Sequence, residues 1–228
     1  MFKQIMVVAA AVLVLLLSGC ASNSKMAFSN DTDVISKTGK PIFLMSVTLK
    51  NSYKNFQPKL SVVTVDRAVQ VDGNPGYDFG IDDKAKNEID TAEAGNSYLL
   101  RMELENGEYV IKGLTSSRFA VLIYTSFYTP LNVNLKSAGS GVFYVGHIEA
   151  TIRERKDNEF RAGPVAPLLD QAVGGASGGT FDVVISDQWD TDKQKFTSKF
   201  PVLTSVEVKK SILPAFDRVK VQKMMDGV

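Results

Sequence analysis

The chain has 228 residues, 44% of them hydrophobic, and its 26 basic residues nearly balance its 25 acidic ones. This near-neutral charge excludes a bulk electrostatic attraction to nucleic acid or to anionic lipid. The single cysteine and single histidine exclude an internal disulfide, a thiolate metal site and a histidine-pair metal site within one chain. A chain of this length can bury a sizeable core, in one domain or two small ones.

The first 20 residues combine a short basic region, an apolar run and a small-residue end. Lys3 is the one charge before residues 5–17, which are all apolar and lead to Cys20. The run is about thirteen residues long, whereas a membrane-spanning helix needs roughly 20. The pattern therefore predicts a signal segment that is removed, rather than a membrane anchor.

The motif Leu17-Ser18-Gly19-Cys20 resembles the lipobox of bacterial lipoproteins. The resemblance implies that residues 1–19 are a signal peptide cleaved between Gly19 and Cys20. It also implies that the Cys20 thiol receives a diacylglyceryl group and that the new amine is acylated, and three chains hold a protein stably on a membrane. No aspartate follows the cysteine, which by the same resemblance implies the outer membrane, with the domain facing the periplasm.

Composition divides the rest of the chain into three parts. Residues 20–40 are polar and show no apolar period, which predicts a flexible tether. Residues 41–216 contain the apolar patterns and are expected to form a single domain. Residues 217–228 are interpreted as a C-terminal tail with no predicted element.

The domain is predicted to be mainly β, as an antiparallel β-sandwich of about seven or more strands. Asn106-Gly107 favours a two-residue hairpin between the flanking strands. In the longest strand, Tyr144 and Ile148 are expected on one face and His147 and Glu149 on the other. The apolar and alternating segments that predict strands are residues 42–49, 60–71, 98–104, 109–114, 119–128, 131–135, 142–155 and 180–186.

One short helix is expected near the C-terminus, over residues 187–200. Asp187 is a good N-cap residue, and Pro201 ends the helix. Acidic residues lie near its start and basic residues near its end, which complements the helix dipole. Its aromatic residues fall roughly on one face: Trp189, Phe196 and Phe200.

Two segments resemble transthyretin-like, or carboxypeptidase-regulatory-like, β-sandwich modules. In these modules a Pro-Gly-x-Tyr hairpin precedes a strand that reads Gly-x-x-Tyr-x-Gly. This chain has Asn106-Gly107-Glu108-Tyr109, with Asn106 in place of proline, and then Gly-Val-Phe-Tyr-Val-Gly over residues 141–146. Residues 187–203 resemble the C-terminal segment of uncharacterised bacterial lipoproteins that carry this module. The resemblance implies a fold and a compartment but no catalytic residues.

Polar side chains offer weak candidates for chemistry. His147 and Glu149 are two residues apart on one strand face, about 7 Å by strand rise, and an exposed polar face explains both. Two groups of carboxylates could bind Ca²⁺, but the spacing within each group lacks the EF-hand pattern. Helix capping explains the group at residues 187–192. We therefore expect no catalytic residue, metal or cofactor. The carboxylate groups are Asp78, Asp82 and Asp83, and Asp187, Asp190 and Asp192.

Residues 174–180 read Gly-Gly-Ala-Ser-Gly-Gly-Thr and match two motifs superficially. A phosphate loop would need a lysine before Thr180 and a following helix. A nucleophile elbow at Ser177 would need a helix after the serine and a histidine later in the chain. Because a strand is expected after this stretch, and His147 precedes it, a mobile surface loop is the preferred interpretation.

Three functional hypotheses follow. The first is a non-catalytic interaction or structural module that offers loops or a strand edge to a protein partner in the cell envelope. The second is an envelope carbohydrate-binding module that uses exposed rings of Tyr124, Tyr128 or Trp189, which core packing would otherwise bury. The third is a hydrolase with paired carboxylates. The expected contacts are a membrane, through the lipid, and an envelope protein, but no nucleic acid.

Overall fold

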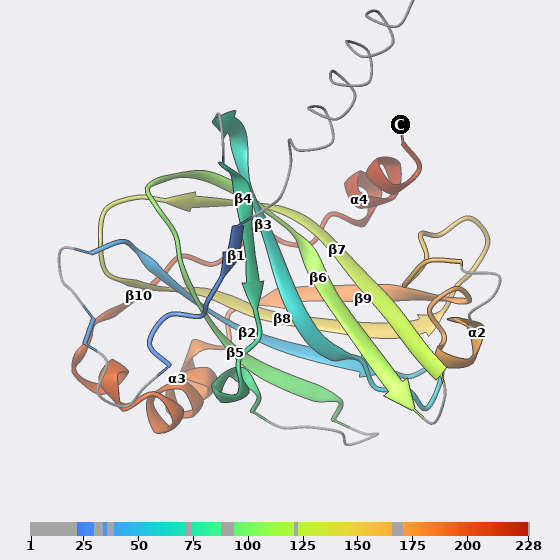
Figure 1. Cartoon of the computed structure of the whole chain (residues 1–228), viewed down its shortest axis with the longest axis horizontal. Coiled ribbons are helices and arrows are strands. Elements are labelled where there is room, and N and C mark those ends of the chain that lie inside the picture. Colours follow the sequence, from blue (N-terminus) through green and yellow to red (C-terminus); the bar gives the residue numbers. More distant parts are fainter. Residues whose placement is uncertain are drawn as a thin grey trace, which may run out of the picture.

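The computed structural model describes residues 22–29, 34–35, 39–71, 74–87, 94–120, 123–165 and 171–227. The predicted signal peptide and Cys20 lie outside these ranges. Within them the chain is mainly β and forms two sheets (Figure 1). No helix in these ranges is long and apolar enough to cross a bilayer.

The first sheet has the strand order β1-β4-β3-β6-β7, and the second has the order β10-β8-β2-β5 with β9 also paired to β8. The strands of the first sheet are β1 Ser22–Ser24, β3 Lys59–Val71, β4 Asn74–Gly80, β6 Gly107–Ala120 and β7 Ile123–Ser137. The strands of the second are β2 Ile42–Asn51, β5 Asn96–Glu103, β8 Val142–Glu154, β9 Gly179–Ser186 and β10 Val208–Lys210.

Both sheets are mixed, so the prediction of antiparallel sheets is wrong. β2 pairs with β8 in parallel, as do β1 with β4 and β10 with β8. Alternation along one strand reports which face is buried but not the direction of its neighbour. Only consecutive strands joined by a tight turn have their direction fixed locally, and each of these three pairs joins strands far apart in the chain.

Two predictions of local structure, one hairpin and one single strand, are also wrong. The strands on either side of Asn106-Gly107 belong to different sheets, because β5 pairs with β2 while β6 pairs with β3 and β7. The turn therefore crosses between sheets. Conversely, residues 119–128, predicted to be one strand, contain the end of β6 and the start of β7, which pair with each other. No Gly, Pro, Asn or Asp in residues 119–124 signals a break between two strands.

One buried cluster takes side chains from both sheets, and it forms the main core. Met45 and Leu49 of β2 share it with Val63 of β3 and Ile111 of β6. The opposite face of the second sheet carries another cluster, in which Leu44 and Tyr144 pack against Phe196. β2 is thus covered on both faces, which explains its nearly continuous apolar sequence. Each such large side chain contributes about 1.5–3 kcal/mol when fully buried.

Three α-helices lie in the described residues: α2 Gln171–Gly174, α3 Trp189–Lys199 and α4 Arg218–Met225. α3 is the predicted helix, but its N-cap is Gln188 rather than Asp187, whose carboxylate accepts from the Trp189 N–H at 3.1 Å. Pro201 ends α3 and starts a 3-10 turn, η2 Pro201–Ser205.

The two ends of the domain are more ordered than predicted. In the segment expected to be a flexible tether, β1 pairs with β4, Met26 is buried and the Ala27 N–H donates to the Arg101 carbonyl at 2.8 Å. In the segment expected to be a tail, Asp217 caps α4 and Val221 is buried. Short pairing strands and single buried residues leave no periodic pattern, so the sequence did not reveal them.

Candidate functional site

A β-bulge in β8 reverses part of the predicted face assignment. Opposite β2, Leu44 pairs with Tyr144, and the next residue, Met45, pairs with Gly146, so Val145 is an extra residue. Because a bulge shifts the alternation by one, Tyr144 and His147 both face α3. Strict alternation in the sequence predicts them on opposite faces.

The bulge brings together a polar group that we call the α3 cluster: Ser46, Tyr144, His147 and Asp192. The Tyr144 hydroxyl donates to Asp192 Oδ2 at 2.7 Å, and the Ser46 hydroxyl donates to the same oxygen. Ser46 Oγ also lies 2.8 Å from His147 Nδ1. All four residues are buried, and Asp192 is completely inaccessible to solvent. The half-buried Lys195 amine reaches Asp192 Oδ1 at 3.3 Å.

Burial and the Asp192 carboxylate set the protonation of the cluster. Burial raises the pKa of Tyr144, and the hydrogen bond to Asp192 raises it further. Burial lowers the pKa of His147, an effect that Lys195 reinforces and Asp192 and Glu149 oppose. The imidazole is therefore neutral at pH 7. Because a carboxylate only accepts, the Ser46 proton points at Asp192 and the His147 Nδ1–H donates to Ser46.

Serine, histidine and aspartate also make up the catalytic triad of hydrolases, but the order of contacts differs here. In a triad the imidazole lies between the serine and the aspartate. In the α3 cluster the serine lies between the other two, and its hydroxyl is directed at the carboxylate. The cluster therefore joins α3 to β2 and β8. Ser46 was missed from the sequence, although it is a polar residue within an otherwise apolar strand.

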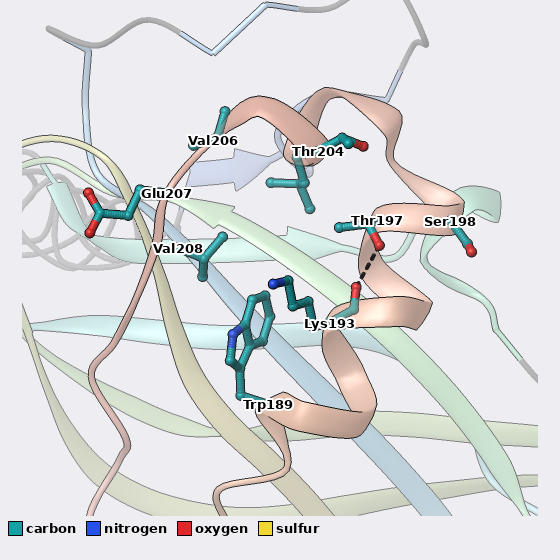
Figure 2. A pocket seen from close by; sticks show the side chains of 9 residues that line it. Trp189, Lys193, Thr197, Ser198, Thr204, Val206, Glu207 and Val208 are labelled. Atoms are coloured by element: carbon teal, nitrogen blue, oxygen red, sulfur yellow. Dashed lines mark hydrogen bonds between the residues drawn. The ribbon is translucent and has the colours of Figure 1, made fainter.

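An open pocket lies directly beside the α3 cluster, between α3 and the chain that follows it. Its volume is about 680 Å³. Figure 2 shows the Lys193 side chain extending from the helix near the indole of Trp189, while the Glu207 carboxylate points away from both. The Trp189 ring lies 4.9 Å from that of Tyr144, so the pocket wall rests on the α3 cluster. The residues that line this α3 pocket are Trp189, Lys193, Thr197, Ser198, Leu203, Thr204, Val206, Glu207 and Val208.

No family model, curated protein or solved structure matches this chain. The resemblance to transthyretin-like modules therefore stays a prediction from its residues. The resembling strand, residues 141–146, runs along β8 and ends in the bulge. Gly146 has φ +117°, and a Cβ there would lie 3.1 Å from the Ser186 carbonyl, so this position favours glycine.

The predicted candidate residues are mostly separated. His147 contacts Ser46, while Glu149 on the same strand is exposed. The three carboxylates near α3 do not form one group. Asp187 pairs with Lys210 at 2.8 Å, Asp190 is exposed, and Asp192 is buried in the α3 cluster. Within the described part of the chain, no three His, Cys, Asp or Glu side chains are grouped to hold a metal.

Asp82, from the other acidic segment, is half-buried and forms an ion pair with a buried arginine. It accepts from Arg101 Nη2 at 2.5 Å and from the Ala85 N–H at 2.7 Å. The Arg101 guanidinium, whose side chain is fully buried, lies 4.3 Å from the ring centroid of Phe200, beyond the end of α3. This contact fixes the helix end to β5.

The glycine-rich stretch is packed rather than mobile. Gly174 and Gly179 are buried, and a Cβ on Gly174 would lie 2.3 Å from the Thr125 hydroxyl oxygen. Ser177 is half-buried, and its carbonyl accepts from Arg161 at 2.5 Å. The glycines therefore let this loop approach β7 closely, which explains them without a phosphate or a nucleophile.

The three candidate binding aromatics lie in different places. Trp189 is half-buried and lines the α3 pocket. Tyr128 is half-buried on β7, where it borders a separate pocket of about 370 Å³. Tyr124 is 49% exposed at the start of β7. Of these three residues, only Trp189 lines the α3 pocket.

Proposed function

We propose that the chain is a lipid-anchored, non-catalytic binding module of the bacterial outer membrane that faces the periplasm and binds its ligand in the α3 pocket. The lipobox at Cys20 supports the anchor. The observation that carries the binding site is the α3 pocket itself, whose helix is fixed in place by the buried Asp192. We also infer that the two mixed sheets, which share one core, form a sandwich of the transthyretin-like kind.

The non-catalytic part of the proposal is supported by the state of the acid and base groups. His147, Ser46 and Asp192 are buried and bonded to one another. A general base must reach the proton of a bound substrate within hydrogen-bond distance or through one water. The α3 cluster instead directs its hydroxyl protons at its own carboxylate. The accessible groups of the pocket are an indole, an amine, hydroxyls and a carboxylate.

A pocket is favoured over the strand edges at β5 and β7 because neighbouring segments already bond part of the backbone of these two strands. At β5, the Ala27 N–H donates to the Arg101 carbonyl, and the Asn87 N–H donates to the Ser97 carbonyl at 2.9 Å. On β7, the Tyr128 N–H donates to the Ala162 carbonyl at 2.8 Å. A partner strand would have to displace these bonds before it could pair.

An envelope protein is the proposed partner, and envelope carbohydrate is the second candidate ligand. The specific observation in favour of carbohydrate is the position of Trp189. An aromatic ring beside an amine and hydroxyls can stack on the apolar face of a sugar while the polar groups bond its hydroxyls. Because Trp189 is the one tryptophan in the chain, its fluorescence reports directly on this pocket.

Affinity purification from gently solubilised envelope tests the proposal. We expect a stoichiometric protein partner to co-purify with the chain. The Cys20→Ala form should lose both its membrane association and the partner. The double variant Lys193→Ala/Glu207→Ala should weaken recovery. Its matched control is Glu108→Ala/Lys136→Ala, which removes the same charges from an exposed cross-strand pair of the first sheet.

Each outcome distinguishes the candidates. Equal recovery with both double variants would exclude the α3 pocket as the protein site. Soluble peptidoglycan or polysaccharide fragments that change Trp189 fluorescence, together with no recovered protein, would assign the pocket to carbohydrate. An unchanged membrane fraction for Cys20→Ala would contradict the lipid anchor.

A further inference from the structure

β10 is the outermost strand at one edge of the second sheet. It pairs with β8 in parallel from Val208 to Lys210, while β9 pairs with a different part of β8, over residues 147–154. The chain continues to bond β8 after β10, because the Ser211 N–H donates to the Tyr144 carbonyl at 2.8 Å. β10 therefore has one side against β8 and an outer side that forms the edge of the sheet.

The outer main-chain groups of β10 are unpaired. Alternate residues of a strand direct their N–H and C=O groups to the same neighbour. Because the Ser211 N–H bonds to β8, Lys209 also faces β8, and Val208 and Lys210 direct their main-chain groups to the outer side. Among the residues that the structure describes, none bonds to these outer groups. A free strand edge of this kind can be extended by a strand from another chain.

The α3 pocket lies beside this edge. Val208 lines it, and Figure 2 shows the Val208 side chain around one space with those of Lys193 and Trp189. A strand added to β10 would lie about 4.8 Å from it. The residue of that strand opposite Val208 would face the same side of the sheet. Its side chain would therefore point toward the α3 pocket.

Most charged side chains of α3 and β10 already have partners. Lys210 pairs with Asp187, just before α3, at 2.8 Å. Lys195 pairs with Asp192, and the Lys199 amine donates to a main-chain carbonyl. The charged residues that remain on these two elements and between them are Asp190, Lys193, Glu207 and Lys209.

The cation of the α3 pocket is Lys193. It forms no ion pair within the described part of the chain, although Asp190 is one turn before it on α3. The Glu207 carboxylate points away from it in Figure 2. Lys209 follows Val208 directly, so its side chain is on the opposite face of the strand. A carboxylate from an added strand would therefore meet the Lys193 amine in a charge-assisted hydrogen bond.

We propose that the partner adds an extended, acidic segment to the outer edge of β10 and places a carboxylate side chain opposite Val208, beside the Lys193 amine. This inference rests on the proposed protein partner of the α3 pocket and states how that partner binds. The main-chain groups supply affinity, and the pocket selects the acidic side chain. Lys209 and Lys210 disfavour a second copy of the chain, because pairing of two such edges brings like charges together.

Two substitutions of Lys210 separate the main-chain bond from the side chain. Lys210→Pro removes the outer N–H, and an edge strand tolerates proline where this group faces outward. Lys210→Ala is the matched control, because it loses the same ion pair with Asp187 and keeps the N–H. In affinity purification from solubilised envelope, we expect Lys210→Pro to recover at least about fivefold less partner than Lys210→Ala. Circular dichroism checks that both variants are folded.

Two further readouts keep β10 unchanged. In the recovered complex, the amides of Val208 and Lys210 should exchange their hydrogens more slowly than in the free chain, because bonded amides are protected. Lys193→Gln should lower recovery of the partner, and Lys193→Arg, which keeps the cation, should restore it.

The outcomes separate this inference from the proposed function. Equal recovery by Lys210→Pro and Lys210→Ala, or unchanged exchange at Val208 and Lys210, would overturn the strand addition. A loss of recovery with Lys193→Ala/Glu207→Ala would then still assign the partner to the α3 pocket. Equal recovery by that double variant and its control would overturn both proposals. An untagged second copy of the chain as the only recovered protein would overturn the acidic partner.

Discussion

Replacing Asp192 tests whether the α3 cluster fixes the helix. Asp192→Ala removes the acceptor for two buried hydroxyls, those of Ser46 and Tyr144. A buried polar group without a partner costs about 1–3 kcal/mol. The lost Lys195 contact adds little, since that amine is partly exposed. The desolvation of the carboxylate is recovered, which offsets part of the loss. We therefore expect a net loss of about 3 kcal/mol in the free energy of unfolding.

Urea unfolding measures this loss. With a slope of about 2 kcal/mol per molar urea, the midpoint should fall by about 1.5 M. Far-ultraviolet circular dichroism reports the whole domain, while Trp189 fluorescence reports α3, because its ring contacts Tyr144. Asp192→Asn keeps one acceptor oxygen and should lose about half as much.

Asp190→Ala is the matched control, because Asp190 is an exposed carboxylate on the same helix. A surface substitution of this kind usually changes stability by less than about 0.5 kcal/mol. An Asp192→Ala loss no larger than that of Asp190→Ala would refute the role assigned to the α3 cluster.

Three further predictions concern pH, close packing and the ion pair of Arg101. Burial lowers the pKa of His147, so below about pH 6.5 the unfolded state binds more protons than the folded state. The free energy of unfolding should therefore decrease as the pH falls, by up to about 1.4 kcal/mol per pH unit. Urea titrations of His147→Gln should show a flatter pH dependence. Gly174→Ala places a Cβ 2.3 Å from a threonine hydroxyl oxygen and should lower the melting temperature by several degrees, whereas Gly80→Ala, whose nearest contact is 3.9 Å, should lower it much less. Arg101→Met removes the cation beside Asp82, which is partly exposed and keeps its bonds from Ser29 and the Ala85 N–H, so it should cost about 1–2 kcal/mol in urea unfolding. A loss below about 0.5 kcal/mol would contradict the assigned ion pair.

The sequence predicted the features that depend on local pattern. Alternating residues predicted β5, β8 and β9, a run rich in aliphatic residues and threonine predicted β3, and the aromatic face and Pro201 predicted α3. A single strand or helix must match its own burial, so its period is visible in the residues. The covered second sheet also accounts for the apolar run of β2.

Long-range features could not be predicted. Ser46 and Asp192 are 146 residues apart, and no local pattern relates them. The bulge at Val145 moved Tyr144 to the face of His147, because one extra residue inverts the alternation. The α3 pocket depends on how α3 and residues 203–208 pack together, so only Trp189 among its lining residues was proposed from sequence.

Intact-mass analysis of the chain extracted from cell membranes tests the central claim most directly. We predict a chain that begins at Cys20 and carries a diacylglyceryl group and an N-acyl group, with no such species from the Cys20→Ala form. A chain that keeps residues 1–19, or one that is cut elsewhere and carries an unmodified Cys20, would contradict the claim that this is a lipid-anchored envelope protein.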